Sequence, residues 1–257
     1  MKRVDLNCDM GESFGAWQLG DDEELLRHVS SANIACGFHA GDPSVARRTL
    51  RAAAARGVAV GAHPGLPDLA GFGRRNMDVA PEAVYDFVAY QVGALLGLAR
   101  TVRVPLAHVK AHGALYNMAV TNAALASAIA RAVHDVDDDL IFFGLPGSAL
   151  LTEAERIGLR TASEVFADRG YEPDGSLTPR GTPGAFVHDP EHAARRAVRM
   201  VLEHAVEARD GTTIDVRADT ICVHGDGPNA AQIARLLRQR LEEAGVRILP
   251  PGAMTEP

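Results

Sequence analysis

Ionisable side chains recur directly after short apolar segments in this sequence. Residues 31–43, "SANIACGFHAGDP", begin as a small apolar run and turn abruptly to glycines around His39. "GAHPG" places His63 in the same position, and "HVKAHG" places Lys110 and His112 there. Imidazole, carboxylate and ammonium groups are those that general acid/base catalysis and metal binding use. Such chemistry requires a fold that brings these side chains together.

The apolar segments predict an α/β architecture. Each has the length of a buried strand, and the stretches between them carry apolar residues at helical spacing, as at Val84, Val88 and Val92. This alternation predicts a parallel sheet, and strands that are apolar on both faces are typical of a barrel covered by helices. The expected strands are 3–7, 32–36, 58–62, 106–110, 140–144, 161–166 and 220–224. The expected helices are 21–29, 43–56, 81–101, 122–134, 148–157, 190–208 and 228–244.

Six of the seven expected strands end in ionisable groups, always at the C-terminal end. In a parallel β/α barrel these ends converge on one face, where such folds place their chemistry. The sequence therefore predicts one shared pocket. The polar residues that follow the strands are Asn7, Asp9, Glu12, His39, His63, Lys110, His112, Glu164, Asp168, Arg169, His224 and Asp226.

Two interpretations of this pocket stay open. Asp9, His39 and His63 could supply two imidazoles and one carboxylate to zinc or a similar divalent ion. The preferred interpretation is a hydrogen-bonding pocket for general acid/base catalysis, because the sequence has no compact ligand motif such as HExxH. His108 and His112 have an H-x3-H spacing, but it straddles a strand end, where the two residues would be roughly 13 Å apart.

Composition excludes several classes of protein. The net charge of −7 argues against a surface for nucleic acid or anionic membranes, and 47% hydrophobic residues allow a sizeable core. Three scattered cysteines give no disulfide framework. Because no segment resembles a signal sequence or a membrane span, we expect a cytoplasmic protein. No linker-like change in composition divides the chain, so residues 1–257 are expected to form a single barrel domain.

Motifs for nucleotide binding and for serine hydrolases are missing from the sequence. Neither of the two lysines follows a G-x4-G run, so there is no Walker A motif. No strand is followed by G-x-G-x-x-G, and no G-x-S-x-G elbow occurs.

Six sequence blocks together resemble the LamB/YcsF family, known as the A-type component of 5-oxoprolinase. They are "DLNCDMGESFG", "SANIACGFHAGDP", "GAHPGLPDLAGFGRR", "HVKAHGALYN", "EVFADRGYEPDGSLTPR" and "VHGD", and they run in order over about residues 3 to 252. The family usually has proline where this chain has Ala111. That change loosens a turn but leaves Lys110, His112 and Asn117 in place.

The resemblance implies a seven-stranded β/α barrel of the glycoside hydrolase/deacetylase type, related to the TIM barrel. It also implies ATP-dependent hydrolysis of 5-oxo-L-proline to L-glutamate with two partner subunits, B and C. On this basis the expected catalytic residues are Asp9, Glu12, His39, His63, Lys110 and His112. The expected substrate-binding residues are Asn7, Arg74, Glu164, Arg169, Arg180, His224 and Asp226. Magnesium would accompany ATP, held by one or two carboxylates.

Two other hypotheses remain beside this one. The chain could be a metal-dependent hydrolase or deacetylase of carbohydrate or N-acyl substrates, by analogy of fold. It could also be a non-catalytic subunit whose barrel binds substrate or organises its partners. The sequence does not decide which subunit binds ATP, which groups act as acid and base, or the oligomeric state.

Overall fold

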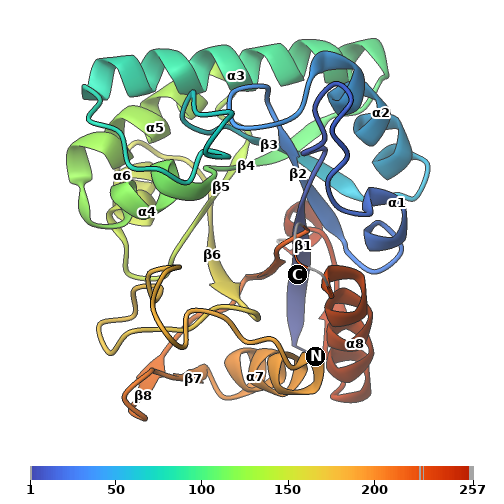
Figure 1. Ribbon diagram of the computed structural model, residues 1–257, viewed down its shortest axis with the longest axis vertical. Helices are drawn as coiled ribbons and strands as arrows, with labels where there is room; N and C mark the ends of the chain where they lie inside the picture. The colour runs from blue at the N-terminus through green and yellow to red at the C-terminus, as the bar shows by residue number, and fades with distance from the viewer. Residues whose placement is uncertain (1, 226, 228, 255–257) are drawn as a thin grey trace.

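A computed structural model of the protein describes residues 2–225, 227 and 229–254. Within this part of the chain, seven parallel strands close into a barrel, and helices surround it (Figure 1). The barrel strands are β1 (Arg3–Met10), β2 (Ser31–Ala35), β3 (Ala59–His63), β4 (Leu106–Lys110), β5 (Ile141–Gly144), β6 (Thr161–Phe166) and β9 (Thr220–Val223). The predicted seven-stranded parallel barrel is thereby confirmed.

β1 closes the barrel because it pairs with a strand on either side. Asp9 is in register with Asn33 of β2, and Asn7 is in register with Cys222 of β9. The short strand β10 (Arg247–Ile248) pairs with the beginning of β1. The two ends of the described chain are thereby joined at the amino end of the barrel.

Helices pack against the outside of the barrel. They are α1 (Asp22–Leu25), α2 (Pro43–Ala54), α3 (Pro81–Thr101), α4 (Gly113–Thr121), α5 (Ala123–Val136), α6 (Ala149–Arg156), α7 (Pro190–Leu202) and α8 (Ala230–Glu243). A 3-10 helix, η1 (Pro251–Met254), follows β10. None of the helices in the described residues is both long and apolar enough to cross a membrane.

Two elements differ from the sequence-based expectation. The helix expected over 190–208 ends at Leu202, because His204 adopts a left-handed backbone conformation with φ of 55°. The chain then forms the hairpin of β7 (Ala205–Glu207) and β8 (Thr213–Asp215), which lies at the edge of the molecule (Figure 1). Helix α4 was not expected, and it begins directly after His112 at the end of the barrel where the site lies.

Alternate residues of each barrel strand point into the barrel. Along β1 the inward residues are polar: Asp5, Asn7 and Asp9 are all buried. Their neighbours Leu6 and Cys8 belong to the apolar core that the helices cover. The barrel interior therefore holds a column of polar side chains, and the main hydrophobic core lies between barrel and helices.

Asp5 lies at the bottom of this column and is fully buried. Its two carboxylate oxygens accept hydrogen bonds from the hydroxyl groups of Ser30, Ser31 and Thr220, at 2.6 to 2.9 Å. Burial nevertheless raises the pKa of Asp5 from 3.8 to about 6, against the lowering effect of these three hydroxyl groups. The native protein therefore binds a proton at Asp5 more tightly than the unfolded chain does.

A raised pKa gives the stability of the protein a definite pH dependence. The free energy of unfolding is expected to fall as pH rises from 4 to 7, by about 3 kcal/mol from Asp5 alone. Urea unfolding of the wild type and of Asp5→Asn across this range isolates the contribution. The stability of the wild type relative to the variant should fall with pH. A gap that stays constant or widens in favour of the wild type would show that the hydroxyl groups outweigh burial.

Candidate active site

Lys110 forms the centre of the polar column near the carboxyl end of the barrel. Its Nζ atom lies 2.8 Å from Asp9 Oδ1, 3.0 Å from Glu164 Oε1 and 2.9 Å from Cys222 Sγ. Burial alone would lower the pKa of Lys110, but Asp9, Cys222 and Glu164 hold it well above its usual value. Burial alone would raise the pKa of Asp9, but His63 and Lys110 hold it well below its usual range. The pair is therefore charged at neutral pH.

Asn7 and Glu164 lie deeper in the barrel than a substrate-binding role requires. Both are fully buried, and Asn7 donates hydrogen bonds to Glu164 and to Thr220. Asn33 donates to both Asn7 and Asp9, so these polar groups satisfy one another. We therefore reassign Asn7 and Glu164 as residues that position Asp9 and Lys110.

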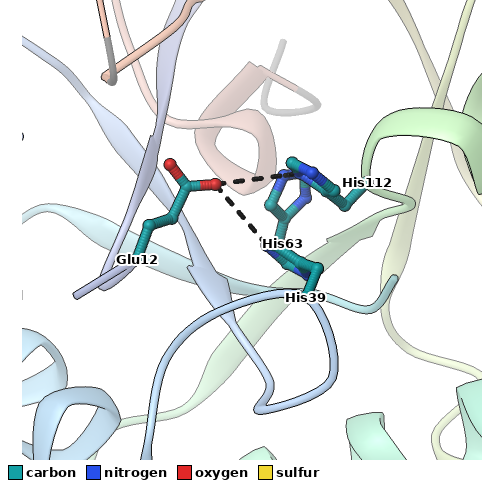
Figure 2. Close-up of side chains that lie close together, drawn as sticks. All are labelled: Glu12, His39, His63 and His112. Carbon is teal, nitrogen blue, oxygen red and sulfur yellow. Dashed lines mark hydrogen bonds and ion pairs between the residues drawn. The ribbon is translucent and has the colours of Figure 1, made fainter. Parts of the chain in front are cut away.

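Three histidines and a glutamate meet at the carboxyl ends of β1 to β4. Figure 2 shows the Glu12 carboxylate facing His39, His63 and His112, with Glu12 on the opposite side from the imidazoles. The rings of His39 and His112 stack, with centroids 3.7 Å apart, and His63 lies edge-on to both. Burial, with neighbouring histidines beside them, lowers the pKa of His39 and His112 well below the usual value. Both rings are therefore neutral at neutral pH.

A tight loop at residues 68–75 covers the stacked imidazoles. Gly73 adopts φ of 62°, and a Cβ atom there would lie 2.7 Å from His39 Cβ and 2.9 Å from His112 Cδ2. The Gly73 carbonyl also accepts a hydrogen bond from the backbone of Ala114 at the start of α4. Glycine at this position thus lets the loop pack directly on the two rings.

Gly73→Ala is expected to lower the free energy of unfolding by about 2–4 kcal/mol, because steric overlap adds to backbone strain. Gly175→Ala is the matched control. Gly175 also has positive φ, but nothing lies within 4 Å of its added Cβ, so only the strain of about 1–2 kcal/mol applies. Equal losses in the two variants, measured by chemical denaturation, would contradict close packing of the loop on the histidines.

Asp168 and His224 form a second polar pair at the same end of the barrel. His224 Nδ1 lies 2.9 and 3.1 Å from the two oxygens of Asp168, and its ring stacks on Phe166. Burial alone would raise the pKa of Asp168, but His224 brings it below its usual value. An ionised Asp168 keeps the proton on Nδ1, which leaves Nε2 as the acceptor.

The arginines predicted to bind substrate differ in their surroundings. Arg169 is buried and donates hydrogen bonds to the carbonyl groups of Thr178 and Ala185, so it holds the 167–189 loop together. Arg74 stacks over Phe72, and Arg180 stacks over Phe186. Both lie at a cleft of about 290 Å³ beside the site, together with His224. Arg74 and Arg180 are therefore better placed than Arg169 to meet a substrate.

A small cavity connects these groups. It measures about 20 Å³, room for one or two waters, and its walls include Asp9, His63, Lys110, His112 and His224. The structure thus brings the six predicted catalytic residues to one end of the barrel, with His224 beside them. Predicted residue Asp226 lies outside the described residues.

Three contributors to the site were missing from the predicted set. Asp168 was recognised only as a polar residue after the sixth strand, and the sequence carries no signal for its partnership with His224. Asn33 and Cys222 lie within segments that look like ordinary buried strands. Their contacts with Asp9 and Lys110 arise only when the barrel closes.

The fold and the site define a seven-stranded β/α-barrel protein with an ionisable site at the carboxyl ends of its strands. A protein of Enterococcus faecalis described as a putative cellobiose-phosphate cleavage protein has the same fold, with a TM-score of 0.59 and 15% identity, covering 99% of both chains. A structure described as T48 deacetylase with substrate matches with a TM-score of 0.52 and 14% identity, covering 99% of this chain and 92% of the other. These likenesses show the fold alone.

The chain belongs to the LamB/YcsF family, whose sequence profile matches residues 4–256. It is 58% identical to the A-type component of 5-oxoprolinase from Bordetella pertussis over 95% of this chain and 97% of the relative. The Bacillus subtilis protein of the same name is 54% identical over 96% of each chain. The crystal structure of a lactam utilization protein from Thermus thermophilus superposes with a TM-score of 0.91 at 52% identity, covering 96% of this chain and 99% of the other.

Proposed function

We propose that this chain is the component of an ATP-dependent 5-oxoprolinase that opens the lactam ring of 5-oxo-L-proline to give L-glutamate. The observation that carries the proposal is the match to relatives named as the A-type component of 5-oxoprolinase, at 54–58% identity over nearly the whole chain. The Thermus thermophilus neighbour, named a lactam utilization protein, points to the same class of substrate. A polar cavity at the barrel end suits a small, charged lactam.

The reaction sets clear chemical requirements. Water adds to the lactam carbonyl carbon, the ring C–N bond breaks, and a proton from water passes to the nitrogen, which leaves as the amine of glutamate. A base must take a proton from water, and an acid must protonate the leaving nitrogen. Positive charge or hydrogen-bond donors must stabilise the carbonyl oxygen as it gains negative charge.

His224 and Asp168 have the geometry of a general acid/base pair. With Nδ1 bound to Asp168, His224 Nε2 can accept a proton from water and then return it to the ring nitrogen. Asp168 would hold the tautomer and stabilise the imidazolium while His224 is charged. We therefore propose a proton-transfer role for His224 in place of the substrate-binding role expected from sequence.

The other residues bind and orient the substrate in this proposal. Lys110 brings positive charge to the inner wall of the cavity, and Asp9 and Glu164 hold it in place. Arg74 or Arg180 at the adjoining cleft would pair with the substrate carboxylate, which an arginine can bind in a bidentate manner.

ATP with Mg²⁺ belongs to the proposed reaction of the whole enzyme, but this chain does not fit a triphosphate at its site. Among the described residues, the N-termini of α2 and α7 are closed by the carboxylates of Asp42 and Asp189. The sequence also lacks a phosphate-binding loop. We propose that partner subunits, expected to be B and C, bind ATP, and we assign no step to ATP within this barrel.

Reconstitution tests this function. The chain, purified alone and together with its partner subunits B and C, is incubated with 5-oxoproline, ATP and Mg²⁺, and glutamate is measured. We expect glutamate only from the full assembly with ATP. Release of no glutamate by the correctly assembled enzyme would refute the proposal. The alternative of a metal-dependent deacetylase rests on likeness of fold at 14–15% identity, so we do not propose it.

A further inference from the structure

The protonation of His63 and His112 is fixed by two backbone carbonyl groups. His63 Nδ1 lies 2.8 Å from the carbonyl oxygen of Lys110, and His112 Nε2 lies 2.8 Å from that of Phe72. A carbonyl oxygen can only accept a hydrogen bond, so both of these ring nitrogens carry hydrogen. In the neutral rings, the lone pairs are therefore on His63 Nε2 and His112 Nδ1.

These two nitrogens face one another at 3.0 Å. Two lone pairs at this distance repel unless a cation or a shared proton lies between them. Hydrogen bonds from the far ring nitrogens to backbone carbonyls are the arrangement that commonly orients metal-ligating histidines. The geometry of the two rings therefore suits a cation bound at their facing nitrogens.

His39 and Glu12 complete the set of ligands. His39 is fully buried, and neither of its ring nitrogens has a hydrogen-bond partner among the described residues. Its Nε2 atom lies 3.5 Å from Glu12 Oε1, and the same oxygen lies 3.7 Å from His112 Nδ1. One ligand atom from each of the four residues lies within 4.8 Å of every other (Figure 2).

We propose that Glu12, His39, His63 and His112 bind one divalent transition-metal ion, with zinc as the reference case. Tetrahedral coordination at 2.0–2.1 Å places ligand atoms roughly 3.3 Å apart, and the distances given above run from 3.0 to 3.7 Å. Three imidazoles and one carboxylate are ligands that such ions favour. Near the small cavity, a bound ion would supply a Lewis acid to the site.

This ligand set differs from the set expected from sequence, which was Asp9, His39 and His63. Asp9 Oδ1 already accepts hydrogen bonds from Lys110 and Asn33, and Asp9 Oδ2 lies 3.4 Å from His63 Nε2. Asp9 is therefore engaged in charge pairing inside the barrel. Glu12 and His112 take the remaining positions around the metal.

Metal binding to the purified full-length chain tests the proposal without any turnover. After removal of metals with a chelator, the protein is dialysed against Zn²⁺ or Co²⁺, and bound metal is measured by mass spectrometry. Co²⁺ also reports its coordination through visible absorption. We expect one ion per wild-type chain, and an affinity reduced at least 10- to 100-fold in His39→Ala and in Glu12→Gln. Glu12→Gln keeps the size of the side chain, so it tests the site even if His39→Ala unfolds.

Two control variants locate the ion. His192→Ala removes an exposed histidine at the start of α7 and should keep full binding. His224→Gln should also keep it, which separates this site from the neighbouring group of Asp9, Cys222 and His224. A wild-type chain that binds no stoichiometric metal, or variants of Glu12 and His39 that bind it normally, would overturn the proposal. A metal-binding chain without lactam hydrolysis would leave this inference in place and remove the proposed function.

Discussion

Lys110→Met is expected to destabilise the protein by about 3–5 kcal/mol and to abolish glutamate release. The substitution removes the ammonium group that pairs with Asp9 and Glu164, and it leaves both carboxylates buried without their cation. Removing one partner of a buried ion pair carries a cost of this size because the remaining charge is poorly solvated. Chemical denaturation measures the loss of stability, and the reconstituted enzyme measures activity.

A compensated variant separates folding from chemistry. Lys110→Met combined with Asp9→Asn and Glu164→Gln removes the buried charges together, so most of the stability should return. Activity should not return, because the charged wall of the cavity is gone. A triple variant no more stable than Lys110→Met would contradict the assignment of Lys110 as the cation that balances the two carboxylates. An active triple variant would contradict its role in the reaction.

His224→Gln should lower the turnover number by about 10²–10⁴ with little change in stability. The side chain lies at the cavity wall, and its Nδ1 atom is held by Asp168. Asp168→Asn should lower turnover similarly, because an amide no longer fixes the required tautomer. The assay is initial glutamate release by the assembled enzyme at saturating 5-oxoproline and ATP.

The matched control is His134→Gln, which changes an exposed histidine on α5. It should leave turnover unchanged. If His224→Gln retains wild-type turnover, the proton transfers belong to another group, and the histidine cluster around His63 becomes the candidate.

The sequence predicted the barrel well where apolar runs have sharp limits. The strands 106–110 and 161–166 and the helix 81–101 occur with the predicted bounds. The prediction was wrong after Leu202, since the apolar pattern continues while His204 turns the backbone and starts a hairpin. Helix α4 was missed because it begins at Gly113 without a side-chain cap.

The rule that strand ends carry the chemistry brought Glu12, His39, His63 and His112 together correctly in space. It could not give depth along the barrel. Asn7 and Glu164 are polar, but the inward face of each strand buries them beneath the cavity. Nor could it indicate that two backbone carbonyls orient the histidine rings, since such contacts depend on how the loops fold.

The central claim is that the lactam ring binds and opens at the carboxyl end of this barrel. A crystal structure of the assembled enzyme with 5-oxoproline tests it most directly. We predict the ring carbonyl in the cavity between Lys110 and His224, with the substrate carboxylate toward Arg74 or Arg180. Density for the ligand in the separate cleft beside Arg195 and Arg199, or on a partner subunit only, would contradict the account.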